Sequence, residues 1–349
     1  MKLFRSGASS VIGLDIGSHA IKLVELGGSL ASPKVSAWGV TKTPSNAFAE
    51  NAISDAGLIG EAVENLLVQS GAKSDTVAVA VSSSHAITKV LGMPADISEL
   101  ELEEQVSIEA LHFVPYPIDE VNIDFEVIGP SSVNAQENDV LLVACRRSII
   151  DDYIDLMESS DLNLKFIDID TYALERSLRN QVRINPNSQN PVALFDIGSS
   201  TSHLMLLDNE RVIYSRHQNF GGSQLIKQVR KEYGVNGEEA EGILNSAQLP
   251  GDFLSSVQEP FAEQLAQEIN RALQFFYSSS PHSNIDSVVL SGAASGLEGL
   301  AGDLEHTMRT QVTTLNPLNN VRVMSNRTSI SSQAHALATA FGLSLRGLH

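Results

Sequence analysis

Cysteine is nearly absent from this chain of 349 residues, which contains only Cys145. One thiol forms neither an internal disulfide nor a cysteine-based zinc site, and such a composition is typical of a reducing compartment. No apolar run reaches the roughly 18 residues that a membrane-spanning helix needs, and the first residues lack the apolar core of a signal peptide. We therefore expect a cytoplasmic protein that meets a membrane only through a partner.

Basic residues are also scarce. Lys and Arg number 23 against 42 Asp and Glu, for a net charge of −19. Nucleic-acid affinity comes mainly from neutralised phosphates, so this balance excludes a non-specific nucleic-acid binder. An anionic membrane surface would repel the chain as a whole.

The charge imbalance is greatest from Val90 to Cys145, where there is no Lys or Arg at all. The same window holds twelve acidic residues. Two interpretations stay open: a solvated acidic face that keeps the protein soluble, or a docking surface for a basic segment.

Three common catalytic or phosphate-binding motifs are missing. The chain has no GxxxxGK[ST], no GxGxxG and no GxSxG. These absences exclude P-loop, dinucleotide-binding and nucleophile-elbow assignments. The nine histidines are scattered, and lone histidines such as His19 and His203 are usually surface or core residues.

What the chain does contain is an internal repeat. The segment Val11–Leu26, with Asp15-Ile-Gly-Ser in its middle, matches Val192–Leu207, with Asp196-Ile-Gly-Ser, at a constant offset of 181 positions. Each copy predicts two apolar strands joined by a turn that carries Asp and Gly. Two related hairpins half a chain apart predict two related lobes.

Such a turn can hold a phosphate, because glycine lets backbone N–H groups point at oxygen atoms. The aspartate then makes sense if it holds Mg²⁺ through water. We therefore predict that Asp15 and Asp196 bind a magnesium ion and that Gly17, Ser18, Gly198 and Ser199 approach the phosphates of one nucleotide. Lys22 could reach the same phosphates, or lie exposed on its strand. Ordinary structural turns are the alternative.

Two further segments suit a nucleotide. Gly221 and Gly222 precede a helix whose first amides could meet phosphate or ribose. Ser291-Gly292 follows a buried strand, and its small residues would let an adenine lie against the backbone. A plain loop and tight strand-to-helix packing are the respective alternatives.

Periodicity and capping signals place the remaining elements. We expect a helix opened by a capping box between Ser98 and Glu101 and stopped by Pro115 and Pro117. The other expected helices are 56–69, 148–159, 171–178, 224–233, 237–246, 257–277 and 332–345; the expected buried strands are 76–81, 140–144 and 285–290, with a linker at 180–191.

The order of hairpin, acidic insertion, second hairpin, Gly-Gly loop and Ser-Gly turn resembles the actin-like ATPase superfamily that includes FtsA. Within it, the chain is similar to the PilM family of type IV pilus assembly. The stretches that carry this resemblance are Asp15–Lys22, Leu91–Pro94, Phe113–Pro117, Val121–Phe125, Val140–Ala144, Asp170–Arg176 and Glu238–Glu241.

The resemblance implies an α/β fold of two lobes with duplicated phosphate-binding hairpins and an inserted FtsA-type 1C subdomain. Residues 1–75 and 165–190 would form lobe I, 76–164 the insertion, 191–330 lobe II, and 331–349 a closing helix that returns to lobe I. The site residues it implies are Asp15, Gly17, Ser18 and Lys22 for the first phosphate motif, Asp196, Gly198 and Ser199 for the second, Gly221 and Gly222 beside the nucleotide, Glu241 near the ribose or base, and Gly292 in the adenosine motif.

The implied function is to bind MgATP between the lobes, with weak or no hydrolysis, and to dock the cytoplasmic tail of a PilN-like bitopic inner-membrane protein. Pilus ATPases and the platform protein would be further partners. Alternatives are an FtsA-like or actin-like filament former, a small-molecule kinase of the same fold, and the counterpart from an MSHA pilus or a type II secretion system.

Overall fold

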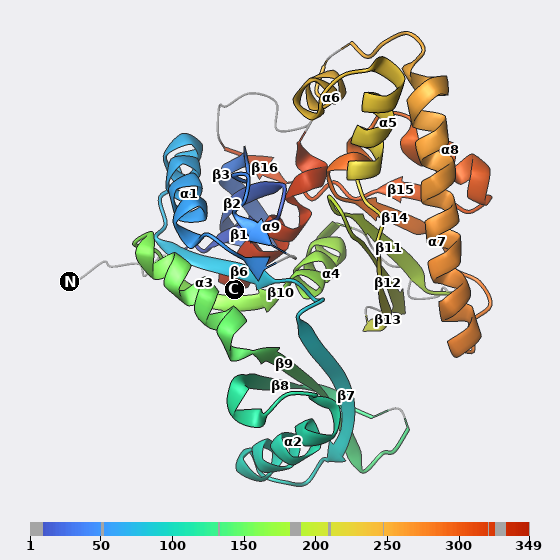
Figure 1. The fold of residues 1–349 in the computed structure, drawn as a ribbon. Helices are drawn as coiled ribbons and strands as arrows, with labels where there is room; N and C mark the ends of the chain where they lie inside the picture. The colour runs from blue at the N-terminus through green and yellow to red at the C-terminus, as the bar shows by residue number, and fades with distance from the viewer. Residues whose placement is uncertain are drawn as a thin grey trace.

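A computed structural model describes residues 10–49, 52–131, 133–181, 190–208, 211–246, 248–319, 321–324 and 333–348. Three sheets of six, five and three strands organise the described chain, together with a short two-stranded ribbon, β4 (Phe48–Ala49) and β5 (Ala52–Ile53) (Figure 1). No helix in these ranges is long and apolar enough to cross a membrane.

The first sheet has the order β10-β6-β1-β2-β3-β16. Its strands are β1 (Ile12–Ile16), β2 (Ala20–Ser29), β3 (Ser32–Lys42), β6 (Thr76–Val81), β10 (Asn163–Ile169) and β16 (Arg322–Val323). Two helices, α1 (Ala56–Ser70) and α3 (Arg147–Ser159), cover one face, and α1 uses Ile59, Val63 and Leu66 for this packing. The expected helix 56–69 and strand 76–81 are confirmed.

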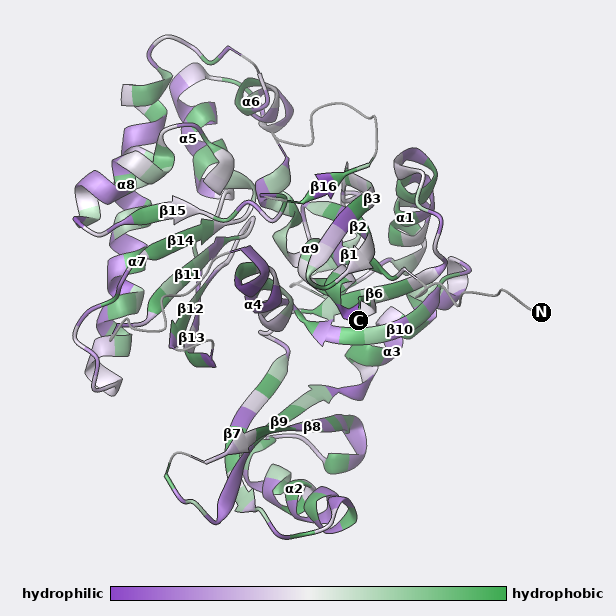
Figure 2. Cartoon of the chain, turned by 180° about the vertical axis from the view of Figure 1, so that it is seen from behind, coloured by the Kyte–Doolittle hydropathy of each residue, from purple (hydrophilic) through white to green (hydrophobic). Residues whose placement is uncertain are grey.

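The second sheet has the order β13-β12-β11-β14-β15. Its strands are β11 (Val192–Ile197), β12 (Ser202–Asp208), β13 (Arg211–Gln218), β14 (Val288–Ser291) and β15 (Val312–Thr314). One face carries the largest apolar core, built against α5 (Ser223–Tyr233), α6 (Gly237–Leu244), α7 (Glu259–Ser279) and α8 (Leu300–Met308). The hydropathy colouring shows β11 and β14 as apolar strands in the middle of this layer (Figure 2).

Two helices, α4 (Asp170–Gln181) and α9 (Ala338–Ser344), lie between the sheets. Leu174 and Leu178 of α4 share an apolar cluster with the second sheet, while Phe341 of α9 packs on β2 and β3. Only glycine fits at position 342, because a Cβ atom there would lie 1.8 Å from the Ala173 carbonyl oxygen. The small residues of α9 thus allow backbone-to-backbone packing between the sheets.

The third sheet forms a separate small body, with the order β7-β9-β8. It comprises β7 (Ala86–Pro94), β8 (Val121–Pro130), β9 (Glu137–Arg146) and the helix α2 (Glu99–Phe113) on one face. The capping box at Ser98 is present and α2 ends before Pro115, as predicted. Since β6 and α3 pack into the first core, only 86–146 of the expected insertion 76–164 belong to this body.

Several predicted boundaries shift. The expected strand 285–290 becomes β14 at 288–291, and the expected helix 257–277 becomes α7 at 259–279 behind a π-helical turn, Leu254–Gln258. The closing helix divides into a 3₁₀ turn (Ala334–Leu337), α9 and a second 3₁₀ turn (Leu345–Gly347). Of the expected linker, Asn180 and Gln181 end α4, and 182–189 lie outside the described residues.

Candidate functional site

The internal repeat folds as two hairpins with the same register. Asp15 pairs with Lys22 across β1 and β2, and Asp196 pairs with His203 across β11 and β12. In each sheet the Asp-bearing strand also has a parallel neighbour, β6 for β1 and β14 for β11. Both aspartates therefore lie at a carboxyl edge of parallel strands, which is where open α/β sheets bind ligands.

Lys22 is the cation of the first hairpin. Its ammonium nitrogen lies 3.0 Å from Oδ2 of Asp15, and both side chains are about one-fifth exposed, at 19% and 20%. The amine rests against the turn, since a Cβ atom on Gly17 would lie 3.2 Å from Nζ. The hydroxyl of Thr43 donates to the Gly17 carbonyl over 2.6 Å and holds the turn in place.

Asp196 is the corresponding acid of the second hairpin. Burial raises the pKa of the Asp196 carboxyl, and the Asp15 charge acts in the same direction, while the Ser291 hydroxyl and the Lys22 ammonium oppose it. The two aspartates and Lys22 are therefore electrostatic neighbours although they come from two different sheets. The structure thus brings together the two Asp-Gly turns that the repeat predicted.

A third carboxylate, that of Asp170, joins them. It begins α4 directly after β10, and its Oδ1 accepts the backbone N–H of Ser83 over 3.0 Å. Burial raises the pKa of Asp170 to about 6, and Asp196 is close enough to add to that shift. Asp170 was not among the site residues predicted from the sequence. An acid directly after the buried strand 163–169 was the signal that could have identified it.

The Gly-Gly loop packs on the second hairpin turn. The amide of Gly222 donates to the Gly198 carbonyl and that of Ser223 to the Ser199 carbonyl, both over 2.8 Å. A Cβ atom on Gly221 would lie 2.5 Å from the Ser199 carbonyl oxygen. Gly221 is therefore required by this packing, and the contact of Gly221 and Gly222 with a nucleotide stays a prediction.

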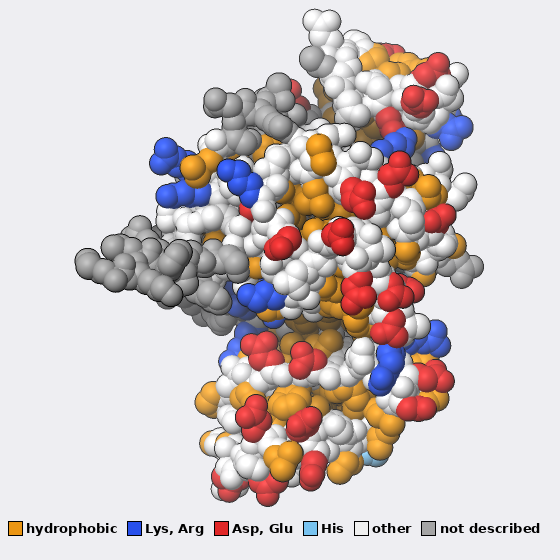
Figure 3. Space-filling view, turned by 90° about the vertical axis from the view of Figure 1, so that its left-hand side faces the viewer, with side chains coloured by type: hydrophobic (Ala, Val, Ile, Leu, Met, Phe, Trp, Pro, Cys, Tyr) orange, Lys and Arg blue, Asp and Glu red, His pale blue; other side chains and the backbone are white. Residues whose placement is uncertain are grey.

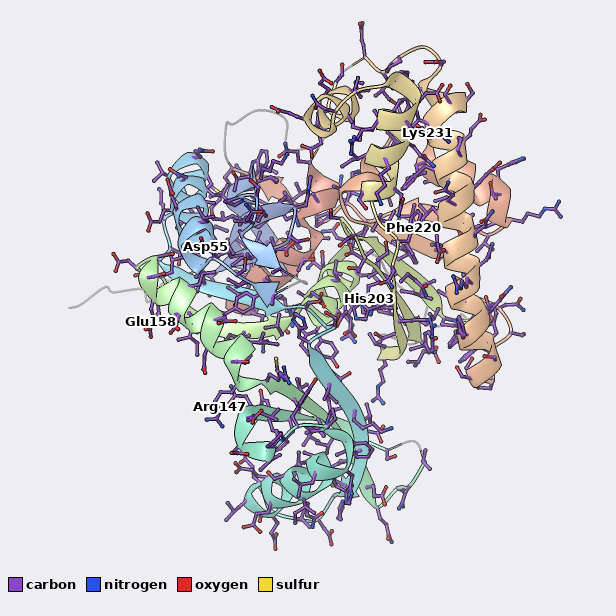
Figure 4. The ribbon with its side chains drawn as sticks, in the orientation of Figure 1. Asp55, Arg147, Glu158, His203, Phe220 and Lys231 are labelled. Carbon is purple, nitrogen blue, oxygen red and sulfur yellow. The ribbon has the colours of Figure 1, made fainter. Side chains whose placement is uncertain are left out.

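Phe220 anchors this loop. Its buried ring stacks on Phe261 with centroids 5.6 Å apart, and its carbonyl accepts the Ser202 hydroxyl over 2.7 Å. Figure 4 shows Phe220 in the part of the molecule that carries the second sheet.

Gly292 also packs tightly on the second hairpin. Its φ is +89°, and a Cβ atom would lie 2.2 Å from the Ile197 carbonyl oxygen. Because that backbone leads into the Asp196 turn, any larger residue at 292 would disturb the turn itself. The structure therefore gives Gly292 a structural role beside its predicted place in the adenosine motif.

Glu241 of α6 faces the first hairpin turn. Its carboxylate lies 2.9 Å from Nζ of Lys42 and 3.9 Å from Nε2 of His19. This contact joins a helix of the second sheet to the turn of the first hairpin. A base or ribose contact of Glu241 stays a prediction, and Lys42 is a partner that sequence reasoning did not identify.

His203, opposite Asp196, is a core residue. Its ring stacks on His217 with centroids 4.2 Å apart, and its Nε2 lies 2.8 Å from the Ser215 hydroxyl. Burial lowers the pKa of His203 to about 3, so its ring is neutral at pH 7. Figure 4 shows its place in the second sheet.

Two sheets that each carry an Asp-bearing hairpin, with the two aspartates as electrostatic neighbours, are characteristic of the actin-like ATPase fold. A family model described as type IV pilus assembly protein PilM matches residues 13–348, so the chain belongs to the PilM family.

One solved structure supports this assignment, and a second supports the fold alone. The chain is similar to a component of the "PilM-PilN type IV pilus biogenesis complex", with 25% identity and a TM-score of 0.80, covering 97% of this chain and 99% of that one. It also resembles the ethanolamine utilization protein EutJ from Carboxydothermus hydrogenoformans, at 14% identity and a TM-score of 0.60, covering 96% of this chain and 89% of that one.

Proposed function

We propose that this type IV pilus assembly protein binds MgATP between its two main sheets, which would form lobe I and lobe II. The observation that carries the proposal is the cation Lys22, held beside Asp15 and within electrostatic reach of Asp196. Carboxylates repel a triphosphate unless a divalent cation intervenes. The described residues contain no group of three or more acidic, His or Cys side chains able to hold a metal directly.

Magnesium in this site would bind to Asp15 and Asp196 through water and take its remaining ligands from phosphate oxygens. The amine of Lys22 would then leave Asp15 for a phosphate oxygen. Gly17, Ser18, Gly198 and Ser199 would surround the phosphates. We expect weak or no hydrolysis, because holding a triphosphate does not by itself position an attacking water.

Calorimetric titration with ATP tests this proposal. We expect Asp15→Asn and Asp196→Asn each to lower the affinity by at least about tenfold when Mg²⁺ is present, since each removes one charge facing the ion. Asp151→Asn, on the exposed face of α3, is the matched control and should bind like the wild type.

Circular dichroism would establish that each variant is folded. Wild-type affinity in both site variants would refute the MgATP proposal. If the protein pellets with MgATP, the filament-forming alternative would be favoured. If phosphate release rises when small acceptor molecules are added, the kinase alternative would be favoured.

We further propose that the protein docks the cytoplasmic tail of a PilN-like inner-membrane protein, and is thereby held at that membrane. Two observations support this. The chain is similar to a component of a PilM-PilN complex, and its small body carries the acidic window free of Lys and Arg. Tails beside a membrane helix are rich in Lys and Arg. The junction between the small body and the first sheet is our proposed site.

The tail proposal is tested by surface-based kinetics with a synthetic tail at low and moderate salt. Glu101, Glu103 and Glu104 are exposed on α2, away from the proposed junction site, so they would act on the tail only through the long-range field of the small body. Changing all three to Gln should slow association about threefold and flatten its salt dependence without directly removing a contact. Gln at 101 preserves the capping box.

Changing Glu61, Glu64 and Glu263 to Gln makes the same change in net charge elsewhere and is the control. If the association rate of the wild type does not vary with salt, the acidic window takes no part in docking. We would then interpret it as a solvated face that keeps the protein soluble.

A further inference from the structure

The small body, 86–146, carries most of the exposed large hydrophobic side chains of the described residues. Of the seventeen large hydrophobic side chains exposed among the described residues, ten belong to it. They are Val90, Leu100, Ile108, Leu111, Phe113, Tyr116, Ile118, Val127, Ile128 and Val133. Figure 3 shows this body at the bottom, where orange and red side chains are mixed. Exposed apolar residues gathered among acids are typical of an interaction surface.

One groove concentrates these features. It has a volume of about 480 Å³ and is lined by Val90, Leu91, Gly92, Met93 and Pro94 of β7, and by Gln105, Ile108 and Glu109 of α2. Successive residues of a strand point to opposite faces. A groove lined by five consecutive strand residues therefore runs along the backbone edge of β7. The helix residues have the spacing of one helical stripe.

That edge of β7 is unpaired in the described chain, where β7 pairs only with β9. Lys89 and Pro94, which are residue types that discourage pairing at sheet edges, flank the segment 90–93. The Lys89 ammonium lies over the Phe113 ring, 5.3 Å from its centroid. A strand edge beside a helix is the geometry in which extended peptides add to a sheet.

We propose that this groove binds an extended, basic segment of a cytosolic partner, which adds to β7 as a fourth strand. Backbone groups of residues 90–93 would pair with it, and its alternate side chains would meet two different faces. On the α2 side lie Ile108 and Glu109. On the other side lies Glu137, whose carboxylate covers Gly92 so closely that a Cβ atom on this glycine would lie 2.4 Å from Oε2.

Charge selects the occupant. If a second copy of this chain bound here, two acidic windows that lack Lys and Arg would face each other. Repulsion between their twelve acidic residues each would make that contact unfavourable. A segment that alternates apolar and basic residues would fill the groove and neutralise Glu109 and Glu137. The groove is lined by α2 and the second half of β7. In Figure 1, α2 lies at the end of the small body away from the first sheet, so we treat the groove as separate from the proposed tail site.

The test uses the full chain and a peptide of alternating Val and Lys. Its controls are a Val–Glu peptide and a Val–Lys peptide interrupted by two prolines. We expect the Val–Lys peptide to slow amide hydrogen exchange in 90–93, and Ile108→Lys to weaken its binding about tenfold. Leu100→Lys, exposed on the same helix but outside the groove, should bind within about twofold of the wild type.

Equal binding of the proline-interrupted peptide would overturn strand addition, and equal binding of the Val–Glu peptide would overturn the basic partner. If amide hydrogen exchange in 90–93 slows as the protein concentration rises, without any peptide, a second copy of the chain binds the edge of β7 instead. Loss of tail binding in Ile108→Lys would also overturn the proposal, because the groove would then belong to the tail site.

Discussion

The two hairpins share a sequence pattern and a register, yet they are held in different ways. In the first, a side chain closes the turn: the Lys22 amine lies 3.0 Å from Asp15 and rests on Gly17. In the second, backbone does so: Gly221 and Gly292 approach the chain at 197–199 too closely for any side chain. Where the first hairpin has Lys22, the second has the buried His203.

This difference between the two hairpins shows how a duplicated motif can contribute unequal parts to one proposed site. One lysine, Lys22, lies within electrostatic reach of both aspartates. The second hairpin then needs no cation of its own. Its turn is set rigidly by backbone contacts, and the first is set by a side chain that can move to a ligand.

The largest effect should come from adding a side chain to the rigid turn. Gly292→Ala combines a positive φ with a contact of 2.2 Å to the Ile197 oxygen, and we expect it to lower the free energy of unfolding by about 3 kcal/mol or more. In Gly17→Ala the shortest contact is 3.0 Å, and the loss should stay near 1 kcal/mol. Urea unfolding measures both. Equal losses would mean that the two turns are held alike.

Removing the shared cation comes next. Lys22→Met leaves Asp15 facing Asp196 without compensation, and we expect a loss of about 1–3 kcal/mol at pH 7. The deficit should shrink as pH decreases, because burial raises the pKa of Asp196 and its protonation relieves the repulsion. Lys227→Met, which removes an exposed lysine of α5, is the control and should show neither the deficit nor the recovery. A deficit in Lys22→Met that is independent of pH would argue against cation sharing.

The buried histidine makes stability depend on pH. The pKa of His203 is lowered to about 3 in the folded protein, while the unfolded chain titrates near its ordinary value of about 6.5. The unfolded state therefore binds more protons between these values, and stability falls as pH decreases from about 6.5 toward 3. His203→Gln should reduce the slope by up to about 1.4 kcal/mol per pH unit. An unchanged slope in chemical denaturation at several pH values would contradict this.

The smallest effect concerns the contact between the first hairpin and α6. Glu241→Gln weakens the pairs with Lys42 and His19, which are 63% and 44% exposed. Solvent screens such pairs, so the loss should stay below about 1 kcal/mol and disappear in high salt. A double-mutant cycle with Lys42→Met, at two salt concentrations, measures the coupling. A coupling that persists in high salt would show that this contact holds the sheets together more strongly than we expect.

Features that depend on neighbours in the sequence were predictable. The hairpins at Asp15 and Asp196, the capping box at Ser98 and the helix α1 all follow from patterns within about 20 residues. Asp170 was not found, because its role arises from β10 lying beside β6, which are separated by the whole small body. The partner of Glu241 was missed for the same reason, since Lys42 lies 199 positions away.

The sequence by itself determined the class of fold and the residues that could meet a nucleotide, because the repeat and its Asp-Gly turns are local patterns that the chain states twice. Tertiary structure alone decided that Lys22 serves two aspartates, that Gly221 and Gly292 are held by backbone rather than left free, and that the edge of β7 is open. These properties depend on contacts between segments that are separate in the chain. The packing of the two main sheets around α4 and α9 places Lys22 near both aspartates, contacts beside the second hairpin hold the two glycines, and the strand order β7-β9-β8 leaves the edge of β7 unpaired in the described residues.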